Sequence, residues 1–176
     1  CGAGCRRPKR IREARSPFAR TERSADMSKE MTALPDSLYA RMQSETFVLL
    51  HTIDAESGVP TSSAISWVYA PSPDKLRLAI DQRSRLIANI RNNPAVTLTI
   101  FGGDTVYAVY GKAEVVADAL AEVPFKLTCY DIHVEQVRDA MFYGARLTAL
   151  PEYDKTYDKR AAAKLDGQVF AAMKKA

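Results

Sequence analysis

Short stretches in which apolar and polar residues alternate dominate the chain from about residue 46 to residue 117. A two-residue period of this kind is typical of strands that bury one face. It is clearest in the segment KLRLAID, where Leu76, Leu78 and Ile80 occupy every second position. The pattern predicts strands at residues 46–53, 61–70, 75–81, 95–101 and 105–117. Glycine- and proline-containing turns separate them, so we expect antiparallel pairing, with 61–70 and 75–81 as one hairpin.

Helical patterns flank and interrupt these strands. Residues 34–45 favour a helix that Asp36 or Ser37 can cap. A short amphipathic helix is predicted after Ser84, a good N-cap residue, and Pro94 ends it. The C-terminal part is predicted to form helices at residues 118–130, 133–145 and 158–175, with a last strand at 146–150.

This order of elements predicts a mainly β fold with peripheral helices. Antiparallel strands with one short inserted helix close readily into a small, Greek-key-like barrel. A chain of 176 residues with 47% hydrophobic composition can bury one sizeable core. We therefore expect one domain at residues 31–176, completed by the C-terminal helices.

Residues 1–30 differ from the rest of the chain in charge and pattern. Residues 1–26 hold eight Lys and Arg against three Asp and Glu, or +5, whereas the whole chain has a net charge of +4. The remainder therefore carries −1, which argues against nucleic-acid binding by the folded part. We interpret residues 1–30 as a disordered basic tail, and its first 26 residues as sequence upstream of a natural start at Met27 or Met31.

Few residues of the predicted domain carry ready-made catalytic chemistry. His51 and His133 lack carboxylates or cysteines at metal-ligand spacing, so no metal site is expected. Cys129 is interpreted as a small buried hydrophobe in a reducing, cytoplasmic setting. No stretch approaches the roughly 20 apolar residues of a membrane helix. No side chain stands out as a catalytic acid or base, so the catalytic residues stay unassigned.

Polar residues concentrate in two runs, PTSSAISW and DQRSR, on either side of the predicted hairpin. Paired strands would bring the residues from Ser63 to Trp67 beside those from Ala79 to Asp81. Strand backbone groups could then hydrogen-bond the edge of a flat heterocycle. Ser84, Arg85 and the first amides of the next helix could receive a phosphate.

At this point the chain resembles the flavin-binding split β-barrels related to pyridoxamine 5'-phosphate oxidase. The resemblance covers roughly residues 34–118, and its best marker is DQRSRLIANIRNNP, a serine-arginine pair before a helix that ends at Asn-Pro. It implies a homodimeric split β-barrel with FMN bound at the dimer interface. Carried over by position, the flavin-lining strand is Ser63, Ile65, Ser66 and Trp67, the neighbouring strand end is Ile80 and Asp81, and the phosphate pair is Ser84 and Arg85.

Each of these assignments has a plainer alternative. Ser84 can be only a helix cap, Arg85 only a solvated first-turn residue, and Trp67 only a packing residue. The oxidase members follow the arginine with a lysine where this chain has Leu86, and Arg83 is a candidate replacement. Residues 146–170 contain neither the tryptophan nor the arginine-histidine pair of the oxidase proper, so oxidation of pyridoxamine phosphate is not expected.

We therefore predict a homodimeric FMN-dependent oxidoreductase that acts on an unidentified small molecule, with a donor such as NAD(P)H. One alternative is a deazaflavin-dependent reductase with the same fold. Another is a non-enzymatic module that holds flavin or haem. RNA binding through the tail is the weakest hypothesis. Four aromatic residues could contribute to the dimer surface or simply to the core: Tyr107, Tyr110, Phe142 and Tyr143.

Overall fold

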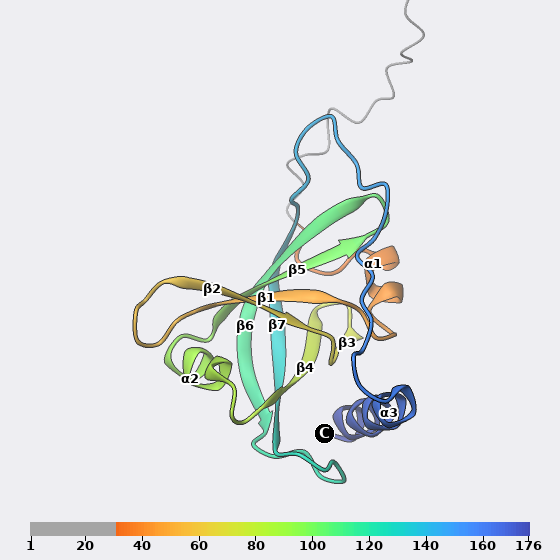
Figure 1. Ribbon diagram of the computed structural model, residues 1–176. Coiled ribbons are helices and arrows are strands. Elements are labelled where there is room, and N and C mark those ends of the chain that lie inside the picture. The colour runs from red at the N-terminus through yellow and green to blue at the C-terminus, as the bar shows by residue number, and fades with distance from the viewer. Residues whose placement is uncertain (1–30) are drawn as a thin grey trace, which may run out of the picture.

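The computed structural model describes residues 31–176, so the predicted basic tail at residues 1–30 lies outside the described residues. Seven antiparallel strands form one sheet in the order β2-β1-β5-β6-β7-β4-β3 (Figure 1). The strands are β1 (Val48–Ile53), β2 (Pro60–Ile65), β3 (Val68–Ser72), β4 (Lys75–Asp81), β5 (Ala95–Gly102), β6 (Thr105–Ala117) and β7 (Leu127–Asp139). The helices are α1 (Asp36–Arg41), α2 (Arg85–Asn92) and α3 (Lys159–Lys175). The mainly β fold with peripheral helices is confirmed.

The sheet curls into a barrel whose two edges are consecutive in sequence. β2 pairs only with β1 and β3 pairs only with β4, so these two strands are the ends of the sheet order. Residues 61–70 were expected to be one strand, but Ser66 and Trp67 interrupt it. The amide of Val68 donates to the carbonyl of Ser66, which turns the chain from one edge to the other. The barrel is therefore split between β2 and β3.

The predicted helices at 118–130 and 133–145 are wrong. Residues 127–139 form β7, which pairs with β6 along most of its length and with β4 on its other side. Its first six residues are all buried, because the barrel core covers one face and α3 covers the other. Burial on both faces removes the alternation that would have marked a strand. The last strand predicted at 146–150 is also absent, since those residues lie in a loop.

The interior of the barrel holds the main hydrophobic core. Leu50, Leu78, Leu98 and Ile132 are fully buried there, and α1 and α2 close its ends with further apolar side chains. A second, smaller cluster lies outside the barrel, between α3 and the strands β3, β4 and β7. No helix among residues 31–176 is long and apolar enough to cross a membrane.

An ion pair on the sheet anchors the C-terminal end of α3. Arg77 on β4 pairs with Asp131 on β7 at 2.6 Å and donates to the carbonyl oxygen of Met173 at 2.9 Å. Burial raises the pKa of Asp131, but hydrogen bonds from Arg77 and Lys75 outweigh it and leave that pKa below its ordinary value. Arg77 thus satisfies a carbonyl in the last turn of the helix, where a cation also complements the helix dipole.

We predict opposite effects on stability for alanine at two glycines. A Cβ at Gly111 would lie 2.3 Å from the carbonyl oxygen of His133, at an irregularity between β6 and β7. Gly111→Ala should therefore destabilise the protein by about 1–3 kcal/mol, the usual cost of overpacking. A Cβ at Gly167, in the middle of α3, meets nothing within 4 Å. Gly167→Ala should stabilise by about 0.5–1 kcal/mol.

Urea unfolding of both variants beside the parent chain measures these two effects. Equal midpoints for the two variants would contradict the prediction.

Candidate functional site

The residues predicted to line a cofactor fall on both sides of the barrel split. Ser66 and Trp67 form the link between β2 and β3, and the carbonyl of Trp67 accepts a hydrogen bond from the amide of Ala79 at 3.1 Å. Trp67 thus lies beside the end of β4, as expected. Ser63 and Ile65 do not, because they lie on β2 opposite Leu50 and Val48 of β1.

Backbone groups are available at this split. β2 has a strand neighbour on one side only, so alternate amides and carbonyls on its outer side have no sheet partner. On β3, by contrast, the amide of Ala70 donates to Met42 and its carbonyl accepts from Gln43. Ser63 and Ile65 lie on such an edge and are only half-buried. The site therefore fits the polar edge of a planar ring, which the backbone of a free strand edge can hydrogen-bond.

Two of the predicted lining side chains are committed elsewhere. The indole of Trp67 packs in the cluster under α3, and its Nε1 donates to Asp166 at 2.9 Å. Ile80 is 4% exposed and belongs to the barrel core. Only the backbones of these two residues are therefore suited to contact a ligand at the split. The side chain of Trp67 is therefore a packing residue, as the plainer alternative in the sequence analysis had it.

The start of α2 presents one capping serine and one unpaired arginine. The Oγ of Ser84 accepts a hydrogen bond from the amide of Leu86 at 3.2 Å, which confirms the cap and leaves its hydroxyl hydrogen to donate elsewhere. Arg85 is exposed, and no ion pair joins it to another residue in the described range 31–176. Hydrogen bonds from Ser57 lower the pKa of Asp54, and the positive charge of Arg85 adds a smaller effect in the same direction. A phosphate could accept from both residues.

The neighbouring arginine is already paired. Arg83 binds the carboxylate of Asp81 through two nitrogens, at 2.7 and 3.0 Å. These hydrogen bonds hold the pKa of Asp81 at about 2. Leu86, where oxidase members have lysine, is 5% exposed and packs into the core. Ser84 and Arg85 are therefore the better-placed candidates for contact with a phosphate, and Arg83 would first have to leave Asp81.

A buried amide that the sequence analysis did not single out fixes the position of α2. Asn89 accepts from the amide of Ala55 at 2.9 Å and donates to Thr52 Oγ1 at 3.0 Å. It is 1% exposed. Asn89 thus ties the helix to the end of β1 and to the turn that follows, which carries Asp54. The one sequence signal that could have identified Asn89 was its position on the apolar face of a predicted helix.

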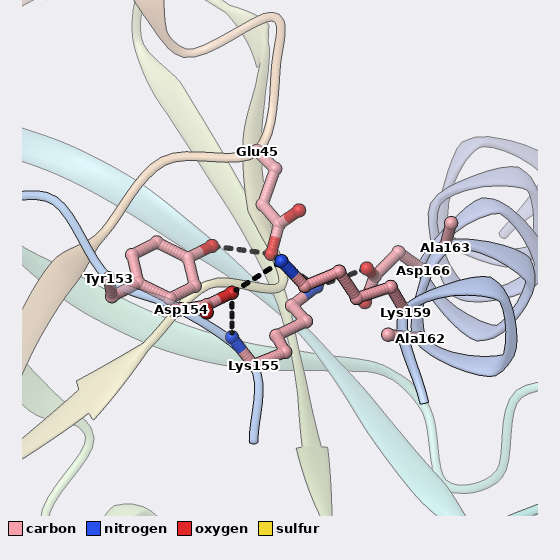
Figure 2. Close-up of a pocket in the computed structure, with 8 residues that line it drawn as sticks. All are labelled: Glu45, Tyr153, Asp154, Lys155, Lys159, Ala162, Ala163 and Asp166. Atoms are coloured by element: carbon pink, nitrogen blue, oxygen red, sulfur yellow. Dashed lines mark hydrogen bonds and ion pairs between the residues drawn. The ribbon is translucent and has the colours of Figure 1, made fainter. Parts of the chain in front are cut away.

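A second missed group joins the C-terminal segment to the barrel split. Figure 2 shows Glu45, Tyr153, Lys155 and Asp166 converging around one pocket of about 350 Å³. Lys155 is bound by both carboxylates, and Asp166 also holds the indole of Trp67. No local pattern marks these residues, because they come from three separate segments.

His51, His133 and Cys129 make contacts that are typical of structural residues. His51 hydrogen-bonds to Thr99 across β1 and β5, and His133 bonds to Glu114 across β7 and β6. Cys129 is fully buried, and desolvation raises the pKa of its thiol to about 11. The interpretation of Cys129 as a buried hydrophobe is confirmed, since a protonated, inaccessible thiol is a poor nucleophile.

Comparison with known proteins identifies relatives of the barrel. Residues 34–141, more than half of the chain, match the family model of pyridoxamine 5'-phosphate oxidase. A Lactobacillus delbrueckii protein, provisionally described as such an oxidase, shares 21% identity with a TM-score of 0.52, over 61% of this chain and 94% of its own. None of the curated proteins compared matches the chain.

Two further structures are similar at a lower level. An FMN-binding protein of Syntrophomonas wolfei shares 14% identity with a TM-score of 0.48, over 60% of this chain and 83% of its own. A structure described as an F420 reductase shares 21% identity with a TM-score of 0.46, over 58% of this chain and 95% of its own.

We predict that Asn89→Ala loosens α2 from the barrel. The change removes the hydrogen bond from Asn89 to Thr52 and leaves the amide of Ala55 without its partner, at a cost of about 1–3 kcal/mol for buried polar groups. Asn92→Ala, at the exposed end of the same helix, is the matched control and should change stability little. Hydrogen exchange of the α2 amides reports the loosening directly, and equal protection in both variants would contradict it.

Proposed function

Because the chain belongs to the pyridoxamine 5'-phosphate oxidase-like family of FMN-binding split barrels, we propose that it binds FMN and acts as an oxidoreductase on a small molecule. The observation that carries this proposal is the start of α2. There Ser84 and the exposed Arg85, which has no ion-pair partner among residues 31–176, follow the end of β4, the neighbour of the edge strand β3. A phosphate and a planar ring would each find the groups they require.

The phosphate end is supported by three features of the chain. The hydroxyl of Ser84 donates to a phosphate oxygen, and Arg85 supplies a charge-assisted hydrogen bond. The N-terminus of α2 adds the positive end of the helix dipole, while its amides at Leu86 and Ile87 already donate to Ser84. Arg83 can bind the phosphate only if the phosphate displaces the carboxylate of Asp81. We therefore assign Arg83 a secondary role.

The ring end relies on backbone rather than on side chains. The free edge around Ser63, Ile65 and Ser66 hydrogen-bonds the polar rim of the isoalloxazine, while the backbones of Trp67 and Ile80 complete the wall. When bound, the flavin itself supplies the hydride and electron transfer. The chain holds its orientation and shields one face from water, which agrees with the absence of an assigned acid or base.

The substrate differs from that of the oxidase proper. Leu86 replaces the second phosphate-binding cation and is buried. The C-terminal residues 146–170 lack the tryptophan and the arginine-histidine pair that the oxidase uses for its phosphorylated substrate. We therefore assign the protein to another small-molecule substrate, with a cytoplasmic donor such as NAD(P)H.

A second copy of the chain is the proposed partner. Phe142 and Tyr143 are 75% and 80% exposed in the loop after β7, and Tyr110 on β6 is exposed beneath Arg138. Large aromatic rings gain more from burial than from contact with water, so a homodimer that covers them is favoured. Tyr107 instead packs against the core.

Light scattering of the FMN-loaded protein should give the mass of a dimer. The mass of a monomer would refute the proposed homodimer.

We predict that Arg85→Ala weakens FMN binding but leaves riboflavin binding unchanged. Riboflavin lacks the phosphate, so only FMN loses the arginine contact. Loss of one hydrogen bond to a charged group costs about 1.5–3 kcal/mol, or a 10- to 100-fold rise in Kd. Arg91→Ala is the matched control, because Arg91 is equally exposed at the other end of α2. Titrations of the parent chain and both variants with each flavin, followed by flavin fluorescence, measure all six Kd values.

Each contrary result has a definite meaning. An equal loss for both flavins in Arg85→Ala would show that Arg85 does not bind the phosphate. A parent chain that takes up neither flavin would refute the FMN proposal, and tight uptake of a deazaflavin by such a chain would favour a deazaflavin-dependent reductase. Tight FMN binding without NAD(P)H consumption with any acceptor would favour a binding module.

A further inference from the structure

The segment before α3 is fastened to the barrel by one lysine. We call residues 151–158 the C-terminal arm. Lys155, in the middle of the arm, places its ammonium between the carboxylates of Glu45 and Asp166 (Figure 2). Glu45 belongs to the link between α1 and β1, and Asp166 lies on α3. One ammonium therefore joins the arm and α3 to the link before β1, which is distant from both in sequence.

This ion triad is shielded enough to matter. The side chains of Lys155 and Asp166 are 21% and 13% exposed. Burial lowers the pKa of Lys155, yet hydrogen bonds to Asp166 and Glu45 outweigh it and raise that pKa above its ordinary value. Lys155 is therefore charged at neutral pH. Without it, two carboxylates would face each other in a partly desolvated pocket, and such an arrangement is unfavourable.

The same carboxylates also reach the barrel split. The other oxygen of Asp166 accepts from the indole of Trp67 at 2.9 Å. The hydroxyl of Tyr153 donates to Glu45 at 2.5 Å, and the side chain of Ser66 lies near that hydroxyl. Ser66 and Trp67 are the two residues that carry the chain from β2 to β3. The triad, together with Tyr153, thus contacts both residues of the link.

A second lysine in the pocket serves as a reference. Lys159 lies on the same pocket, but its side chain is 80% exposed and its contact with Asp154 is 3.6 Å long. An exposed pair of this length contributes little to stability. Only Lys155 is built into the support of the link.

We propose that Lys155 is a positioning residue for the flavin site: its bridge between Glu45 and Asp166 locks the C-terminal arm onto Ser66 and Trp67 and so fixes the wall on which the isoalloxazine lies. This inference rests on the proposed FMN function. It differs from the phosphate assignment because the triad supports the ring end of the site, so its removal acts on FMN and riboflavin alike.

The test compares Lys155→Met with Lys159→Met. Trp67 is the one tryptophan of the chain, so intrinsic fluorescence reports its surroundings without a label. Lys155→Met should shift the Trp67 emission to longer wavelength and raise the Kd of both flavins about 5- to 100-fold, the range of couplings between neighbouring sites. Lys159→Met should change neither quantity, and Lys155→Arg should restore both.

A second variant distinguishes a loss of positioning from a general loss of folding. Asp166→Asn keeps an oxygen that can accept from Trp67 but removes one carboxylate from Lys155, and it should give a smaller rise in both Kd values. Measurements are compared only among variants whose thermal unfolding remains cooperative.

The outcomes separate the two proposals. A parent chain that binds flavin, together with Lys155 variants that shift Trp67 emission but leave both Kd values unchanged, would overturn the positioning role alone. Loss of FMN binding with riboflavin binding intact would also overturn it. A parent chain that binds neither flavin would remove the proposed function and this inference with it.

Discussion

The structure depends on how the sheet closes. Seven strands curl until β2 and β3 approach as the two ends of the sheet, and the closure is made by chain connectivity rather than by a ladder of hydrogen bonds. Ser66 and Trp67 alone carry the chain across. Backbone groups without a strand partner on the β2 edge follow from this, and so does the need for other contacts to hold the link in place. The split is thus the place where the barrel lacks a hydrogen-bonded ladder between neighbouring strands.

Two sets of contacts, one at α2 and one at α3, hold the elements around the split in place. On the α2 side, buried Asn89 ties the helix to β1, so the serine and arginine at its start keep their position. On the α3 side, Arg77 and Asp131 fasten the end of the helix, and Lys155 fastens the arm before it. These contacts place a rigid framework around a site whose own polar groups stay exposed. Such preorganisation is what a protein contributes when the cofactor carries the chemistry.

How well the sequence pattern predicted each element depends on whether that element is buried on one face or on both. Strands that turn one face to the core kept their alternation, so β1, β4, β5 and β6 were predicted close to their observed bounds. β7 is covered on both faces, and its apolar residues then fall at spacings that also suit a helix. The single strand expected at 61–70 became two because a two-residue bend leaves no signal in residue type.

The sequence by itself determined the local features: the hairpins, the cap at Ser84, the end of α2 before Pro94, and the serine-arginine pair that stands there. These depend on neighbours within a few positions, and propensity and periodicity record such neighbours. Only the tertiary structure decided that Trp67 and Ile80 turn their side chains away from the split, and that Glu45, Lys155 and Asp166 meet. Those outcomes depend on contacts between residues up to about a hundred positions apart, and barrel closure brings such residues together without leaving a local pattern.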